Sequence, residues 1–243
     1  MFFKLNLSSK RFFQNAVKQF MKKLSIYILL LLVSTSAFAQ KDAQAKAILG
    51  PVSKKYRSYN AIKSDFTFTL DNAQAAMKFA QNGTLITEPK TNRYKIILYS
   101  QGSTTQVEQE IISDGKTQWV YNRDEKETQV STAGHNTGDF NPAQLFTIYE
   151  HGYKYLYTGD QKKAGKVYQQ IDLTAENTQT PIFKVRLSID KGQKQINSAL
   201  VFDKNGSRYT YTLKSFTPNP PISASTFTYD AKAHPGVEVV DLR

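Results

Sequence analysis

The chain contains no cysteine among its 243 residues. This absence excludes a disulfide scaffold, a cysteine-ligated zinc or iron–sulfur site, thiol catalysis and lipid attachment through an N-terminal cysteine. Histidine is scarce as well, because His135, His151 and His234 are the only three. None of them lies in an HxH or HExxH pattern, so the sequence offers few candidate residues for metal-dependent hydrolysis or for a Ser-His-Asp triad. We therefore expect no metal, no cofactor and no enzyme activity.

Acidic residues are absent from the first 39 positions, which hold six of the 32 Lys and Arg. Residues 40–243 therefore carry 26 basic and 20 acidic residues, a net charge of +6 instead of +12. No basic run of five or more occurs in them, so we expect no nucleic-acid partner. Plain solvation, or weak attraction to anionic lipid headgroups, accounts better for this charge.

Residues 21–39 have the order of parts found in a secretory signal peptide. Lys22 and Lys23 precede an uncharged apolar run over residues 24–33, and small residues follow at Ala37 and Ala39. The run is shorter than the roughly 20 residues that span a bilayer, which disfavours the alternative of an uncleaved anchor. We predict cleavage after Ala39, and we interpret residues 1–20 as an upstream extension before the true start at Met21.

The mature chain begins with a helical pattern and then changes to strands. Apolar residues three and four apart predict one helix over residues 42–56, with a kink or restart at Gly50-Pro51. Alternation with period two then predicts strands, and Asp114-Gly115, Lys191-Gly192 and Asn205-Gly206 predict hairpin turns between them. The predicted strand segments lie within residues 65–70, 94–98, 111–113, 118–121, 153–157, 168–173, 183–187, 195–202, 208–213 and 226–229.

A second helical stretch is predicted over residues 141–151, where Pro142 suits a first turn and Gly152 ends the pattern. A single sheet of about ten strands must curl or be covered, because an open half-apolar sheet would aggregate. We therefore predict a mainly β (α+β) fold, an incomplete antiparallel β-barrel with short helices forming a lid over an apolar cavity. No linker or repeat divides residues 40–243, so we expect a single domain.

Residues 113–122 read SDGKTQWVYN and contain the only tryptophan, Trp119. This string closely resembles the signature of the LolA-type outer-membrane lipoprotein carriers, and the closing PGVEVVDLR of residues 235–243 is similar to the end of that family. The resemblance covers essentially the whole mature chain. It implies a LolA-like half-barrel that works in the periplasm as a monomeric chaperone.

The resemblance also implies a function and partners. Such a chaperone binds the acyl chains of triacylated lipoproteins in its cavity. It receives them from an inner-membrane lipoprotein-releasing transporter and delivers them to an outer-membrane acceptor or membrane. A lipid-sensing or envelope-stress interaction module with the same half-barrel is the alternative, and an enzyme is the least favoured reading.

Candidate residues for the acyl cavity are the aromatic and branched residues on alternating strand positions and on the predicted lid. They are Phe66, Phe68, Tyr94, Ile96, Leu98, Trp119, Tyr121, Leu145, Phe146, Ile148 and Tyr149. Ordinary core packing is an equally good reading for each, because the sequence does not say which face of the sheet is concave.

One position departs from the resemblance. The family carries a lid-gating arginine before a proline where this chain has Glu88-Pro89. A carboxylate accepts hydrogen bonds and cannot donate them. We therefore expect the gating contact at Glu88 to be absent or rebuilt from Lys90 or Arg93, with the lid held mainly by apolar contacts.

Overall fold

The computed structural model describes Met21 and residues 42–134, 141–150 and 152–243. The predicted upstream extension and signal peptide, apart from Met21, lie outside the described residues, as do His135 and His151. In the described part of the chain, no helix combines the length and the apolar character needed to cross a membrane.

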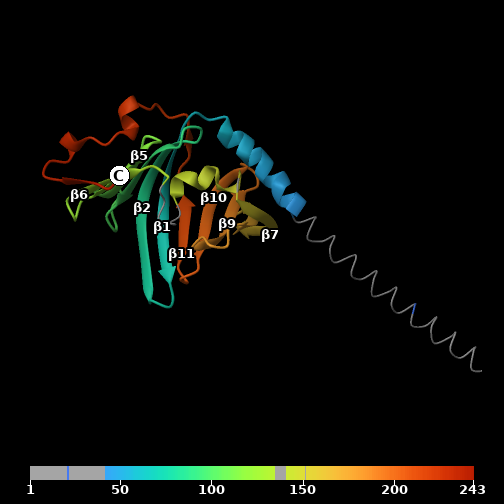
Figure 1. Ribbon diagram of the computed structural model, residues 1–243. Coiled ribbons are helices and arrows are strands. Elements are labelled where there is room, and N and C mark those ends of the chain that lie inside the picture. The colour runs from blue at the N-terminus through green and yellow to red at the C-terminus, as the bar shows by residue number, and fades with distance from the viewer. Residues whose placement is uncertain (1–20, 22–41, 135–140, 151) are drawn as a thin grey trace, which may run out of the picture. The chain divides into compact units, whose positions relative to one another are not determined.

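Two meanders of antiparallel strands form one sheet (Figure 1). The first meander consists of β1 (Ile62–Asn72), β2 (Met77–Glu88), β3 (Arg93–Tyr99), β4 (Val107–Ser113), β5 (Thr117–Asn122) and β6 (Glu127–Thr132). The second consists of β7 (Tyr153–Lys163), β8 (Lys166–Ala175), β9 (Ile182–Asp190), β10 (Gln195–Asp203) and β11 (Arg208–Leu213). They join where β1 pairs with β11, and the two-residue strand β12 (Thr217–Pro218) also pairs with β1.

Over the described residues the sheet has 13 strands and stays open, with β7 at one edge and β13 (Glu238–Asp241) at the other. This arrangement confirms the predicted incomplete barrel. β13 pairs with β6 in parallel, whereas the sequence predicts antiparallel pairing throughout. The parallel pairing arises because the chain returns from β12 through η3 (Ala224–Phe227) and η4 (Ala231–Ala233) before it reaches the edge.

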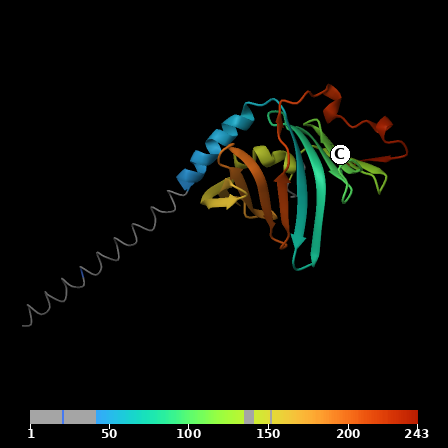
Figure 2. The ribbon, with the colours of Figure 1, turned by 180° about the vertical axis from the view of Figure 1, so that it is seen from behind.

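The connection between the meanders explains what covers the sheet. β6 lies near one edge and β7 forms the other, so the chain between them must cross the sheet. Its described part contains two short 3-10 helices, η1 (Pro142–Phe146) and η2 (Ile148–Glu150). We call residues 141–150 the inner segment and the sheet face against which it packs the inner face. Figure 2 shows the sheet curving around this segment.

The helix described over residues 42–57 packs its predicted face into the same core. Ala45, Leu49, Val52 and Tyr56 are all buried. The helix continues through Gly50-Pro51, so the predicted restart there is wrong. A proline in a helix frees the carbonyl four residues earlier, and here that residue is the exposed Ala47, where water can take the place of the lost donor.

Two further local predictions are wrong. In the predicted strand over residues 226–229, the first two residues end η3 and the last two are irregular, because local hydrogen bonds such as Thr226 N to the Ser223 carbonyl favour a turn. Gly115 and Gly206 have positive φ as predicted, but Gly192 does not. Asp190 Oδ1 accepts from the amides of Gly192 and Gln193, and Lys194 takes the left-handed conformation instead.

Candidate functional site

Most of the predicted cavity residues meet on the inner face. Strand register places Phe66 and Phe68 of β1, and Tyr94, Ile96 and Leu98 of β3, on the same side of the sheet. All five belong to, or pack against, the single apolar cluster that fills the inner face. Whether they contact an acyl chain remains a prediction.

The inner segment fills much of this face with its own side chains. Leu145, Phe146, Ile148 and Tyr149 are between 0% and 9% exposed and belong to the same cluster. The ring of Phe146 lies 4.8 Å from that of Tyr56, centroid to centroid. The predicted lid therefore sits inside the half-barrel, and an acyl chain could reach these residues only by displacing it.

Gly83 makes room for the ring of Phe66. A Cβ atom at Gly83 would lie 2.5 Å from Phe66 Cζ and 2.8 Å from the Ile97 carbonyl oxygen. Real Cβ atoms do not approach other atoms so closely. A side chain at Gly83 would therefore push Phe66, which is 2% exposed, away from β2.

Beyond the inner segment the apolar surface continues as an aromatic cluster of Phe68, Phe79, Tyr209 and Tyr211. The ring centroid of Phe68 lies 5.1 Å from Tyr211, 6.2 Å from Tyr209 and 6.5 Å from Phe79. Tyr211 is buried, whereas the other three are partly exposed. The alternation in β11 could have indicated Tyr209 and Tyr211, but only together with the register to β1.

Trp119 and Tyr121 do not belong to this surface. Ile96 pairs with Ile111, and Ile111 pairs with Val120, so the two flanking residues of β5 point to the opposite, outer face. The prediction that they share a wall with Ile96 is wrong. Residues 224–237, here called the outer segment, cover this outer face: the ring of His234 lies 4.1 Å from that of Tyr121, centroid to centroid.

The motif at residues 113–117 forms the turn between β4 and β5. Asp114 Oδ1 accepts from the amides of Lys116 at 2.8 Å and Thr117 at 2.7 Å. Gly115 has φ +91°, and a Cβ there would lie 2.9 Å from the Thr91 carbonyl oxygen. Both the conformation and the close approach to the neighbouring turn require glycine.

Tyr94 links this turn to the inner segment. Its hydroxyl donates to Gln118 Oε1 at 2.7 Å. Burial raises the pKa of Tyr94, and hydrogen bonds with Asn141 and Ser113 partly offset this. Asn141 caps η1 by accepting from the Ala143 amide at 2.8 Å. A cleft of about 140 Å³, lined in part by Tyr94, Ser113 and Asn141, lies at this junction.

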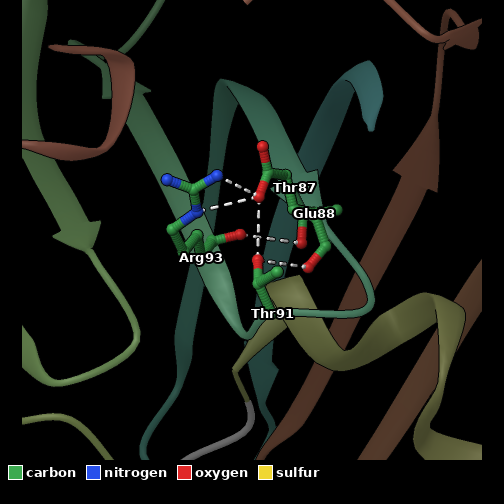
Figure 3. Close-up of polar contacts among 4 residues, drawn as sticks. All are labelled: Thr87, Glu88, Thr91 and Arg93. Carbon is green, nitrogen blue, oxygen red and sulfur yellow. Dashed lines mark hydrogen bonds and ion pairs between the residues drawn. The ribbon is translucent and has the colours of Figure 1, made fainter. Parts of the chain in front are cut away.

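Glu88 is bound by its own hairpin (Figure 3). Its Oε2 atom accepts from Arg93 Nε at 2.8 Å, Arg93 Nη2 at 2.6 Å and Thr91 Oγ1 at 2.8 Å. Arg93 also lies over the Phe227 ring of the outer segment, and Lys90 donates to Asn60. Within the described residues these contacts of Glu88, Lys90 and Arg93 do not involve the inner segment, so the expectation that one of the two cations rebuilds the lid contact is not supported.

A different polar contact holds the inner segment. Glu150 at the end of η2 accepts from Arg57 Nε and Nη2, both at 2.8 Å, and from Ser53 Oγ at 2.7 Å. The hydrogen bond to Glu150 and its charge raise the pKa of Arg57. We call Ser53, Arg57 and Glu150 the latch. The expectation of a lid held mainly by apolar contacts missed the latch. Arg57 and Ser53 precede Glu150 by 93 and 97 positions, and no local sequence pattern links residues so far apart.

The hydroxyl of Tyr149 is a buried polar group of the inner segment. Tyr149 Oη is buried and has no hydrogen bond within the described part of the chain. Burial raises the pKa of Tyr149, so the hydroxyl stays protonated. Among the described residues no cluster of three or more His, Asp or Glu could hold a metal ion.

Residues 57–230 match the family described as outer membrane lipoprotein carrier protein LolA. An outer-membrane lipoprotein carrier protein of Coxiella burnetii is 22% identical over 228 residues, which cover 93% of this chain and 99% of that protein.

A solved structure is similar in fold. An uncharacterized conserved protein from Thermus thermophilus is 12% identical with a TM-score of 0.50, and the match covers 82% of this chain and 99% of that chain. A LolA superfamily protein from Nitrosomonas europaea is 10% identical with a TM-score of 0.44, covering 77% and 98%.

Proposed function

The chain belongs to the LolA family of outer membrane lipoprotein carrier proteins, and from this premise we propose that it is a periplasmic carrier for triacylated lipoproteins. It binds their acyl chains on the inner face of the sheet. It takes them from an inner-membrane lipoprotein-releasing transporter and gives them up to an outer-membrane acceptor or membrane. It performs no chemical step.

The observation that supports this proposal most is the continuity of the apolar surface. The buried cluster around Phe66 and Ile96 runs without interruption into the partly exposed rings of Phe68 and Tyr209. A core that served stability alone would be closed by polar residues at its rim. Here aromatic side chains extend the surface to solvent, as expected for a site that receives apolar ligands.

Displacement of the inner segment supplies the remaining surface. Each methylene buried is worth about 0.8 kcal/mol, so about ten methylenes provide about 8 kcal/mol. This is enough to offset the exposure of several side chains of the inner segment in exchange for acyl chains. The latch then sets how readily the inner segment is displaced.

The experiment that tests the proposal incubates the purified mature protein with membranes that contain radiolabelled triacylated lipoproteins and an energised releasing transporter. A carrier yields soluble complexes of protein and lipoprotein. Soluble complexes with lipid alone favour the sensing module instead, and chemically altered lipid indicates an enzyme. Recovery of none of these contradicts the proposal.

Two neighbouring residues of β1 give matched variants for this assay. Phe68→Glu places a charge on the inner face, and Thr67→Glu places the same charge on the outer face, where Thr67 donates to Asn82 Oδ1 at 3.3 Å. We expect the first variant to abolish soluble complexes and the second to be nearly silent, with near-native circular dichroism for both. Equal release by both variants contradicts binding on the inner face.

A further inference from the structure

β7 is an open edge of the sheet. Within the described residues it pairs only with β8, although it is 11 residues long. At the opposite end of the sheet the edge of β6 is paired, because the four-residue strand β13 lies beside it. A long edge strand offers unpaired backbone donors and acceptors to another extended chain.

The register shows which residues of β7 face outward. The Glu176 amide donates to the Gly152 carbonyl at 2.9 Å, and Lys154 and Leu156 pair with Thr174 and Asp172. Hydrogen-bonded and non-hydrogen-bonded pairs alternate along an antiparallel ladder. The even-numbered residues therefore bond to β8, and the amides and carbonyls of Tyr153, Tyr155 and Tyr157 point to the open edge.

Most of the features that discourage pairing lie in the far half of this edge. A register shift lies between Tyr157 and Gly159, where Gly159 has φ +130°, and Lys162 and Lys163 follow. Bulges and lysines are the usual means by which edge strands avoid association. Residues 153–157 have no bulge and one exposed charge, Lys154.

A groove of about 250 Å³ runs beside residues 153–157. It is lined by the 42–57 helix, η2 and Tyr155, and its charged residues are Lys46, Arg57 and Glu150. Because Glu150 pairs with Arg57, Lys46 supplies the net positive charge of the groove. Lys154 adds a second positive charge on the opposite face of β7. Tyr149, whose hydroxyl lacks a partner among the described residues, lines the same groove.

We infer that residues 153–157 bind an extended acidic peptide as an additional strand, and that this peptide is the segment directly after the acylated N-terminus of the cargo. The inference rests on the proposed function for the identity of the peptide. Tyr153, Tyr155 and Tyr157 pack against the apolar cluster of the inner face, so a strand beside them starts next to the acyl site. The acyl chains and the first residues of the cargo thus bind side by side.

The test follows backbone amide exchange by NMR in the full mature protein. The probe is a synthetic peptide with a triacylated N-terminal cysteine and an eight-residue tail that has glutamate at alternate positions. We expect the probe to slow exchange of the Tyr153, Tyr155 and Tyr157 amides at least about tenfold, while the Lys154 and Leu156 amides, already bonded to β8, change little. A matched probe with lysine in place of glutamate should bind more weakly.

Two perturbations examine the strand pairing directly. Tyr155→Pro removes an outward amide without removing a bond to β8, and it should weaken acidic-probe binding about tenfold, whereas Tyr155→Phe should not. If the proline variant folds poorly, the unmodified protein can be tested with probes in which alternate backbone amides are N-methylated, because N-methylation blocks strand pairing. One of the two methylation registers should bind as weakly as a probe without a tail.

A fluorescent fatty acid separates failure of this inference from failure of the proposed function. If it binds but the three tyrosine amides remain unprotected by the acidic probe, the edge inference is wrong and the carrier proposal stands. If neither ligand binds, the carrier proposal falls together with the inference. Protection that grows with protein concentration in the absence of probe assigns the edge to a second copy of the chain and overturns the peptide assignment.

Discussion

The inner segment should compete with acyl chains for the inner face, and Phe146→Ala tests this competition. Phe146 is 1% exposed, and its ring contacts those of Tyr56 and Phe216 at centroid distances of 4.8 and 6.0 Å. Truncation of a buried phenylalanine to alanine costs about 3–5 kcal/mol. This loss weakens the closed position of the inner segment, since the partners of Phe146 lie outside that segment.

The effect on ligand affinity follows from the fraction of open molecules. A ligand that binds only the open form has its apparent affinity reduced by that fraction. Because about 1.4 kcal/mol corresponds to a factor of ten, the loss raises the open fraction by about 100-fold to a few thousand-fold until the open form dominates. Part of this gain is offset by contacts that Phe146 itself makes with the ligand. We therefore expect acyl affinity to rise at least about tenfold.

Titration with a fluorescent fatty acid measures the change, and Phe227→Ala is the matched control. Phe227 is also 1% exposed, but it lies in the outer segment under Arg93, whose guanidinium carbon is 5.2 Å from the centroid of the Phe227 ring. The control should lower the melting temperature without changing acyl affinity. Unchanged or weaker binding by a folded Phe146→Ala variant would refute the idea that the inner segment occupies the acyl site.

Three further predictions concern the latch, the unpartnered hydroxyl and a buried carboxylate. Glu150→Gln should speed amide exchange in the inner segment, because it weakens the bonds from Arg57 and Ser53, whereas Glu88→Gln should leave that exchange unchanged; equal effects would contradict the assignment of the latch. Tyr149→Phe should raise stability by about 1 kcal/mol, or about 2–4 °C in melting temperature, because it removes a buried hydroxyl without a partner in the described part of the chain; a clear loss would mean that the hydroxyl is bonded. Burial alone would raise the pKa of Asp190, but hydrogen bonds from the Gln193 and Gly192 amides and from Lys166 hold it below its usual range. The stability from Asp190 is therefore present above about pH 4 and lost as the pH falls through the lowered pKa, so Asp190→Asn should be less stable at pH 7, and denaturant titrations should show the difference vanishing in acid.

The strands were the most predictable part of the fold. Alternation such as that of Phe66, Phe68 and Leu70 reflects a sheet with one buried face, and glycines at 115 and 206 marked turns that need positive φ. The open half-barrel followed from the number of strands and the shortage of helices. These features depend on neighbours in sequence, which a single chain displays directly.

The faces of the sheet were not predictable in the same way. Trp119 alternates as regularly as Ile96, but an outer segment more than a hundred residues later covers its side of the sheet. The latch between Arg57 and Glu150 likewise depends on two elements that meet only in the folded state. The alternation at residues 226–229 predicted a strand wrongly, because local hydrogen bonds outweighed a pattern only four residues long.

The central claim is that acyl chains bind on the inner face, and crosslinking from β1 tests it most directly. A photoreactive phenylalanine analogue at position 68 points into the aromatic cluster, and the same analogue at position 67 points to the outer face. Irradiation of soluble complexes with a lipoprotein that carries radiolabelled acyl chains should label the protein from position 68 and not from position 67. Equal labelling from both positions, or labelling from position 67 alone, would contradict the claim.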